Sequence, residues 1–270
     1  MSGMIFHPRY WHVMAAMLAA GGLAAVSASA QEACRLEPVG GGKVAAVRDG
    51  RTLVLDDGRE ARLAGIEVPQ SGDAAAAAAR AALESLAAGH AVMLKRLGTA
   101  EDRYGRLLVY AFRTGGESEH SLQAALLAAG HARVGSRAGG RACAAELLAA
   151  ERAARKQTLG LWADPANGPQ QAENPAGILE HRGRFTMVEG KVLSVREAGG
   201  TIHVNFGRRW SRDFTVTILK RNARTFTAAG VEPKTLEGRR IRVRGWVEQR
   251  GGPIVEAARP EQIEIAELTE

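Results

Sequence analysis

Three arginines stand in short polar segments of the kind that hold phosphate groups. Arg51 follows Asp49 and Gly50, Arg62 opens the segment Arg-Leu-Ala-Gly-Ile-Glu, and Arg106 closes the segment Asp-Arg-Tyr-Gly-Arg. The guanidinium group is planar, keeps its charge at neutral pH and can donate to more than one phosphate oxygen. Cleavage of a phosphodiester needs such donors for the charge of the transition state, together with a cation and an aligned water. These residue types therefore indicate a site for phosphate groups.

A β-hairpin is expected to position the first two arginines. Strand-forming residues flank Asp57-Gly58, which is a strong signal for a two-residue turn. With that turn, Leu53 pairs with Arg62, and Arg51 and Arg62 become diagonal neighbours on one face, roughly 7–8 Å apart at the backbone. Two like charges so close are unfavourable unless an anion or a carboxylate lies between them. Glu67, just after the return strand, is the natural local carboxylate.

The rest of the first half predicts an α+β fold around a small barrel. An alanine-rich segment opens with Asp73, which can cap the start of a helix, and closes at Gly89, which can cap its end. Two more segments with helical patterning end in glycine. Helices are thus expected over residues 73–88, 121–129 and 144–158, and further strands over residues 44–47, 91–96 and 107–113.

Taken in order, these segments resemble the active-site frame of the staphylococcal nuclease (thermonuclease) family. The resemblance covers about residues 43–163. It implies a five-stranded OB-like β-barrel with three helices, and an enzyme that cuts phosphodiesters with calcium. Arg62 and Arg106 match the two catalytic, phosphate-stabilising arginines of the family. Further matching segments are Ser121–Leu126, Ala129–Ala132 and Ala154–Trp162.

Two acidic positions of the family pattern are replaced in this chain. The motif Asp-Gly-Asp-Thr, whose second Asp binds calcium in the family, reads Asp-Gly-Arg-Thr here and places Arg51 at that position. In the motif Asp-Thr-Pro-Glu, the metal-binding Asp becomes Glu67 and the water-orienting Glu becomes Gln70. Calcium takes about six to eight oxygen ligands, usually with several carboxylates among them. We therefore predict weak or absent calcium binding, with Asp49 and Glu67 as candidate ligands and Glu67 as the remaining catalytic carboxylate.

Arg51 itself would fill the volume that the metal ion leaves, paired with Glu67 and Asp49, and would serve as a built-in cation. Arg51, Arg62 and Arg106 would then form a phosphate-binding cluster without the means to cut. The other interpretation is that these arginines form surface ion pairs, because charged residues on hairpins are common. The acidic partners in that case would be Asp56, Glu101 or Asp102.

A second β-rich region follows a linker. Pro, Gly, Asn and Gln cluster over residues 164–183, which is typical of a linker between domains. Residues 184–268 contain short strands at a spacing that suits a second, mostly β OB-like domain, with a compact sandwich as the alternative. The strands are expected over residues 187–195, 201–206, 214–219, 239–247 and 254–258.

Cations and aromatic residues also gather in this second half. On the strand over residues 239–247 they alternate with aliphatic residues, and a strand's period of two then places them on one face. A second basic stretch precedes Trp210. Cations beside aromatic rings are what single-strand nucleic-acid binding needs. The alternative is a solvated charged face with the tryptophans in the core. The candidate nucleic-acid-binding residues are Arg208, Arg209, Arg240, Arg242, Arg244 and Trp246.

Residues 1–30 have the pattern of a secretory signal peptide, so the nuclease-like domain is expected over residues 31–163. Arg9 precedes an apolar run from Val13 to Val26, and Ala28-Ser29-Ala30 is a small-residue cleavage signal. An uncleaved membrane anchor is the alternative, although the run is short for a bilayer. No later stretch is apolar enough to span a membrane. We expect an exported protein, periplasmic or secreted.

The chain contains two cysteines, Cys34 and Cys143. An exported compartment is oxidising, and an even count suits one disulfide between them. Two free thiols are the alternative. A disulfide would tie the start of the mature chain to the late part of the first domain.

Charge and composition favour a folded protein with a polyanionic partner. Hydrophobic residues make up 46% and charged residues 24%, which excludes a disordered chain, and the net charge is +7. We expect binding of nucleic acid or other phosphate-rich ligands, with no cofactor and with metal-dependent cleavage impaired. One alternative is a working periplasmic nuclease that uses calcium or another divalent ion at a rearranged site. Another is a protein-interaction module of the cell envelope. The sequence leaves the oligomeric state open.

Overall fold

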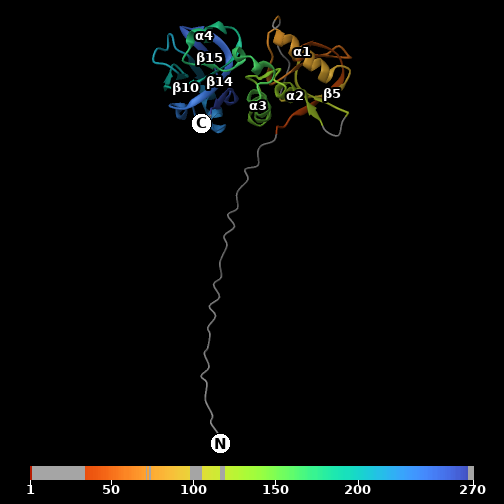
Figure 1. Ribbon diagram of the computed structural model, residues 1–270, viewed down its shortest axis with the longest axis horizontal. Helices are drawn as coiled ribbons and strands as arrows, with labels where there is room; N and C mark the ends of the chain where they lie inside the picture. Colours follow the sequence, from red (N-terminus) through yellow and green to blue (C-terminus); the bar gives the residue numbers. More distant parts are fainter. Residues whose placement is uncertain (2–33, 71, 73, 98–104, 116–118, 267–270) are drawn as a thin grey trace. The chain divides into compact units, whose positions relative to one another are not determined.

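The structure is a computed structural model that describes residues 1, 34–70, 72, 74–97, 105–115 and 119–266 (Figure 1). The expected signal peptide lies outside the described residues, as do Glu101 and Asp102. From Cys34 onward the described chain belongs to one compact unit, Glu32–Glu270. None of the described helices is long and apolar enough to cross a lipid bilayer.

The first half is built on a mixed five-stranded β-barrel, as the sequence predicts. Its strands are β1 (Glu37–Asp49), β2 (Thr52–Leu55), β3 (Glu60–Leu63), β5 (Ala91–Arg96) and β6 (Leu107–Arg113). β1 pairs antiparallel with β5 through its first part and with β2 through its second part, so one long strand serves both sides of the barrel. β3 pairs with β2 and, in parallel, with β6, while β5 pairs with β6. These pairings close the barrel.

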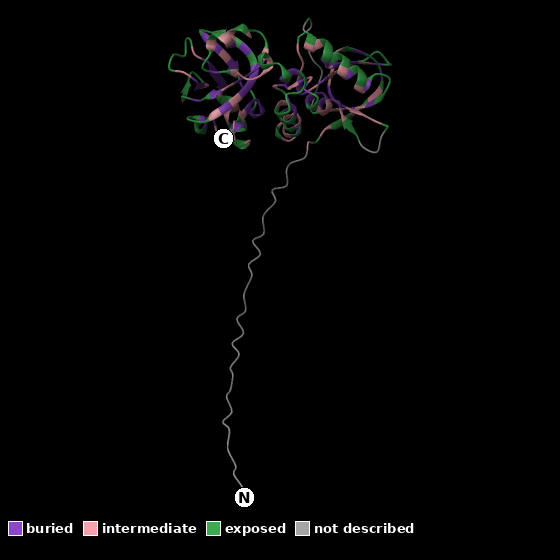
Figure 2. Ribbon diagram, viewed as in Figure 1, coloured by how far each residue is buried: buried purple, intermediate pink, exposed green. Residues whose placement is uncertain are grey.

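The described helices of this half are α1 (Ala74–Ala87), α2 (Leu122–Ala128) and α3 (Arg141–Lys156). The buried residues of α1 recur every four positions, at Ala79, Leu83 and Ala87, and exposed residues follow its outer side (Figure 2). This spacing matches the helical period and gives α1 one apolar stripe. α2 begins at a capping residue, since Ser121 Oγ accepts a hydrogen bond from the Ala124 amide.

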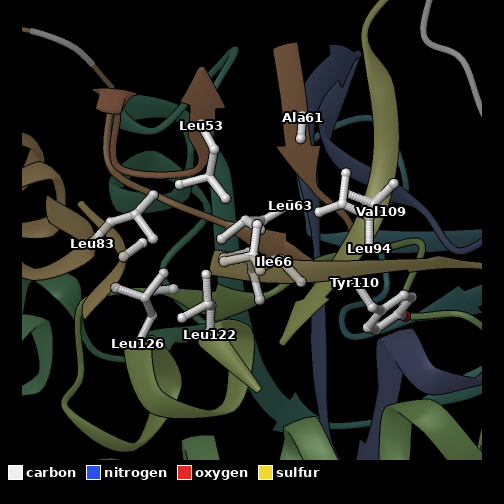
Figure 3. Close-up of a cluster of buried hydrophobic side chains, with 14 of the residues drawn as sticks. Leu53, Ala61, Leu63, Ile66, Leu83, Leu94, Val109, Tyr110, Leu122 and Leu126 are labelled. Carbon is white, nitrogen blue, oxygen red and sulfur yellow. The ribbon is translucent and has the colours of Figure 1, made fainter. Parts of the chain in front are cut away.

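The core between the barrel and its helices anchors the hairpin that carries the arginines. Leu53 of β2 and Leu63 of β3 point into the same cluster as Leu83 of α1 and Leu122 and Leu126 of α2 (Figure 3). All of these leucines are at most 2% exposed. Truncating one such residue costs about 2–5 kcal/mol. Because side chains alternate along a strand, fixing Leu63 inside directs its neighbours to the other face of β3.

Short elements complete the first half and lead into the second. β4 (Ile66–Glu67) pairs with β8 (Arg133–Val134), and β7 (His120–Ser121) extends the sheet beyond β6. α3 leads into η1 (Gly160–Ala163). The residues expected to form a linker contain η2 (Pro165–Asn167), β9 (Gln170–Gln171) and α4 (Pro175–Glu180). β9 pairs in parallel with β10 (Phe185–Lys191), so this segment joins the second sheet.

The second half is mostly β and repeats the strand path of the first. Its other strands are β11 (Ser194–Ala198), β12 (Thr201–Asn205), β13 (Thr215–Leu219), β14 (Arg240–Arg250), β15 (Gly252–Glu256) and β16 (Ile263–Ile265). Neighbouring strands run in the order β11-β12-β13-β15-β14-β10, with β13 and β15 parallel. If β10 and β11 are taken as two parts of one strand, this is the order of the first barrel, where β3 and β6 are the parallel pair. The OB-like expectation therefore agrees with the observed topology.

Helical turns fill the connections of the second half. They are η3 (Lys220–Asn222), α5 (Ala223–Ala228), η4 (Pro233–Leu236) and η5 (Pro260–Gln262). The expected disulfide is present: Cys34 and Cys143 are bonded, with their Cα atoms 4.6 Å apart. It ties the residues before β1 to α3.

Candidate phosphate-binding site

The hairpin that carries the arginines has a register one residue different from the expected one. Thr52 pairs with Arg62 and Leu53 pairs with Ala61, so the expected pairing of Leu53 with Arg62 is wrong. The physical reason is the loop, which has three residues and not two: the Leu55 amide donates to Arg59 O across residues 56–58. Gly58 takes a φ of +84°, a conformation that closes such a loop and that glycine adopts without a steric penalty.

Arg51 lies within a set of oxygen atoms. Its Nη1 donates to the Ile66 carbonyl oxygen at 2.9 Å and lies 2.5 Å from Glu67 Oε2. Its backbone amide donates to Asp49 Oδ1 at 2.9 Å. The guanidinium therefore contacts a carbonyl and a carboxylate, which are the donor types that bind hard cations.

Asp49 links Arg51 to Arg62. Its Oδ2 accepts from the buried Thr52 Oγ1 at 3.0 Å and lies 3.8 Å from Arg62 Nη1. Arg62 Nη1 also donates to Thr52 Oγ1 at 3.3 Å. Both carboxylates of the site, Asp49 and Glu67, are thus already in contact with protein donors.

The three predicted arginines influence one another electrostatically. Burial, and then the charges of Arg51 and Arg106, lower the pKa of Arg62, while Asp49 and Glu67 act in the opposite direction. Arg62 nevertheless stays charged near neutral pH, because the ordinary arginine value lies so far above it. A cluster of cations that repel one another in this way gains from an added anion.

A hollow of about 750 Å³ opens on this cluster. Arg51, Arg62 and Glu67 line it, together with two exposed arginines that sequence reasoning missed, Arg48 of β1 and Arg80 of α1. The wall formed by α1 is held close by Gly50, where a Cβ atom would lie 2.8 Å from the Cβ of Ala79. Such a close approach of helix and hairpin requires glycine.

These residues do not fit a calcium site. No group of three or more His, Cys, Asp or Glu side chains that could hold a metal ion occurs in the described ranges. Glu67 and the Ile66 carbonyl instead hold the Arg51 guanidinium. Calcium would need about six to eight oxygens, and a cation fixed among the available ones repels it. Gln70 lines the hollow as a neutral amide.

The prediction that Arg244 belongs to a nucleic-acid-binding face of the second half is wrong. It is 1% exposed, and its Nη1 lies 2.7 Å from Glu151 Oε2 of α3 while its Nη2 pairs with Glu264. Burial disfavours its charge, but Glu151 and Glu264 outweigh this and raise the pKa of Arg244. The predicted alternation along β14 is present, yet α3 covers this part of the face. Arg244 therefore has no access to a ligand.

The other residues of that set lie in different places. Arg240 and Arg242 are half-buried and both pair with Glu189. Arg208 and Arg209 are exposed in the loop before Trp210. None of these four arginines lines the hollow.

Trp246 is the residue whose position sequence reasoning missed. It lies on β14, yet it lines the hollow that contains Arg51 and Arg62. Its ring is 43% exposed and packs edge-to-face with Phe185, with the ring centroids 6.0 Å apart. No local signal in the sequence connects residue 246 with residue 51, because the contact depends on how the halves of the compact unit pack.

The family model of the staphylococcal nuclease homologue matches residues 60–164. The matched residues include Arg62, Glu67 and Arg106, and begin just after β2 and Arg51. No match to a curated protein was found. The β region after residue 164 has no family assignment. Residues 60–164 of this chain therefore form a staphylococcal nuclease homologue domain.

Proposed function

We propose that the first half of the chain, which contains the staphylococcal nuclease homologue domain, binds the phosphate groups of nucleic acid through Arg51, Arg62 and Arg106, and that its metal-dependent cleavage is impaired. One observation carries this proposal: Arg51 Nη1 contacts the Ile66 carbonyl and Glu67 Oε2, where the family's calcium would find its ligands. The guanidinium takes the place of the metal ion as a cation.

The charges of the cluster support phosphate binding. Arg51 pairs with Glu67, Arg62 lies 3.8 Å from Asp49, and the charge of Arg106 also acts on Arg62. Arg80 adds an exposed cation to the lining of the hollow, where Arg48 also lies with its guanidinium paired with Glu60. Guanidinium groups donate to phosphate oxygens with good geometry. The excess of positive charge therefore favours a polyanion.

The same residues disfavour cleavage. A catalytic metal ion lowers the pKa of a bound water and so supplies a nucleophile at neutral pH. A guanidinium has no coordination position for water and cannot do this. Gln70, which stands where the family has its water-orienting glutamate, cannot accept a proton as a carboxylate does. We therefore assign binding, and no hydrolytic step, to this site.

We further propose that the protein acts outside the cytoplasm, in the periplasm or as a secreted protein. The disulfide between Cys34 and Cys143 supports this, because disulfides persist in oxidising compartments. The signal-like pattern of residues 1–30 is consistent with it.

Binding and cleavage by the purified protein test the proposal together. In chelator, fluorescence anisotropy with a labelled oligonucleotide should show binding that weakens steeply as salt rises. Arg62→Ala should lower the affinity and reduce the slope of log K against log salt by about 1. Arg59→Ala is the matched control, because Arg59 pairs with Asp57 at the exposed tip of the same hairpin.

Degradation assays on plasmid DNA and on RNA with calcium, magnesium and manganese complete the test. We expect no turnover with any of these ions. Cleavage that requires a divalent ion and stops with chelator would overturn the proposal in favour of a working nuclease. Absence of binding at low salt would overturn it as well, and would leave the domain as a scaffold for protein interactions.

A further inference from the structure

Trp246 stands at the junction of two hollows. It lines the hollow of the arginine cluster, and it also lines a smaller neighbouring hollow of about 170 Å³. The residues from Glu67 to Gln70 line both hollows as well. The two hollows therefore adjoin along this loop and the indole of Trp246.

The indole is held in place without being covered. Trp246 and Phe185 are directly opposite in the pairing of β14 with β10, and their rings meet at 72°. Such an edge-to-face pair contributes about 0.5–1.5 kcal/mol beyond its buried area. Even so, 43% of Trp246 remains exposed. An exposed aromatic ring that is fixed by its neighbours loses little entropy when it stacks on a ligand.

The packing of α3 against the second half fixes this indole relative to the arginine cluster. Arg244, two residues before Trp246 on β14, pairs with Glu151 of α3 in a fully buried position. Ala154, Trp162 and Met187 form a small apolar cluster at the same seam. The hairpin and Trp246 thus belong to one packed body.

Both of the hollows that Trp246 lines contain cations. Arg51 and Arg62 line the larger hollow, and Arg133 and Arg184 line the smaller one. Arg184 is exposed, whereas Arg133 is half-buried and donates to the Asn167 carbonyl oxygen at 2.8 Å. A chain of phosphates that follows both hollows would meet positive charge in each of them.

We propose that Trp246 is a base-stacking site and that the two hollows together bind a single strand of nucleic acid. A phosphate would lie on Arg51 and Arg62, and the base beside it would stack on Trp246. Single strands expose the faces of their bases, whereas a duplex keeps them stacked on one another. This inference rests on the proposed function and adds the strandedness of the ligand and the contribution of the second half.

Oligonucleotides with and without bases separate the two contributions. The probes are a labelled thymidine oligonucleotide and an abasic oligonucleotide with the same number of phosphates, both titrated in chelator. Trp246→Ala should weaken binding of the thymidine probe by between about 5-fold and about 150-fold and leave the abasic probe unchanged. Trp246→Phe should restore part of the loss, because it keeps an aromatic face.

Trp210→Ala tests the competing stacking site, since Trp210 is 73% exposed and lines a separate hollow of about 500 Å³ in the second half. It should bind both probes as the wild type does. Thermal denaturation of each variant establishes that it is folded before binding is compared.

The outcomes distinguish this inference from the proposed function. If the wild type binds neither probe, the proposed function fails and the inference fails with it. If the wild type binds both probes equally and Trp246→Ala changes nothing, the stacking site is refuted while phosphate binding stands. A base-dependent loss in Trp210→Ala and not in Trp246→Ala would also refute it, as would tighter binding of a duplex than of the single strand.

Discussion

Replacing Arg51 with aspartate tests whether its guanidinium occupies the place of a metal ion. In the wild-type protein, Arg51 Nη1 lies 2.9 Å from the Ile66 carbonyl oxygen and 2.5 Å from Glu67 Oε2. Aspartate would remove both contacts and would place a new carboxylate beside those of Asp49 and Glu67. Several carboxylates around a backbone carbonyl are the kind of oxygen set that binds calcium. Arg51→Asp should therefore lose stability in chelator and regain it with calcium.

The size of the loss follows from the burial of the ion pair. The side chains of Arg51 and Glu67 are 16% and 19% exposed, so the pair lies between two limits. Surface pairs contribute about 0–1 kcal/mol, and breaking a fully buried pair costs about 3–5 kcal/mol. With the added repulsion among carboxylates, we expect the free energy of unfolding to fall by about 2–4 kcal/mol. Calcium at about 100 times its Kd would return about 2.7 kcal/mol, which raises the Tm by about 5–11 °C.

Thermal denaturation followed by circular dichroism, with calcium and with chelator, measures both effects. The wild type should show no calcium-dependent change in Tm. Arg250→Asp is the control, because it makes the same charge reversal at an exposed ion pair with Glu248 and should show no calcium dependence either. A calcium-dependent rise in the wild type as large as that in Arg51→Asp would refute the reasoning. So would a variant whose Tm does not respond to millimolar calcium.

The remaining predictions concern the buried charges between α3 and the second half. Arg244→Ala should lower the free energy of unfolding, measured in urea, by about 3–5 kcal/mol, because it leaves the buried Glu151 without this partner. The control Arg250→Ala breaks an exposed pair, and its free energy of unfolding should stay within about 0.5 kcal/mol of the wild type. Equal stabilities of the two variants would contradict this prediction. Burial favours the neutral form of Glu264, but Arg244 and Arg155 outweigh it and lower the pKa of Glu264 below the ordinary 4.5. Its stabilising contribution is therefore complete above pH 4.5 and is lost as the pH falls through the lowered value. Glu264→Gln should flatten this acid dependence in urea titrations, and an unchanged slope would refute the assignment.

The hairpin illustrates what a local sequence specifies. Asp57-Gly58 correctly marked a reversal of the chain between two strands, whose residues Leu53 and Leu63 lie in the core. The register was wrong because Asp-Gly is compatible with a two-residue loop and with a three-residue loop closed by a left-handed glycine. The choice between them depends on the backbone conformation of Asp57, because a two-residue type I′ turn needs a positive φ at both Asp57 and Gly58, and of these two only Gly58 has one.

β14 illustrates a different limit. The alternation of polar and aliphatic residues predicted that Arg240, Arg242, Arg244 and Trp246 share one side of a strand, and Ile241 and Val243 are indeed buried on the other. The periodicity of the sequence predicts on which side of the strand a residue lies, but it does not predict which other element packs against that side. α3 supplies Glu151 to one point of that side and buries Arg244, while two positions further along the strand Trp246 stays exposed. The disulfide could be predicted without knowing how the elements pack, because the chain has only two cysteines.

If a guanidinium takes the place of the calcium ion, as proposed, the ligands that the site can distinguish also change. An arginine is covalently fixed, so phosphate binding by this cluster would respond to salt but not to chelator. Contacts to phosphate position a nucleic acid without reading its bases or its strandedness. In a nuclease, cleavage releases the substrate, whereas a strand that is not cut leaves only by dissociation. Any preference for single strands must then come from contacts to the bases, and Trp246 is the exposed ring that the fold places beside Arg51 and Arg62.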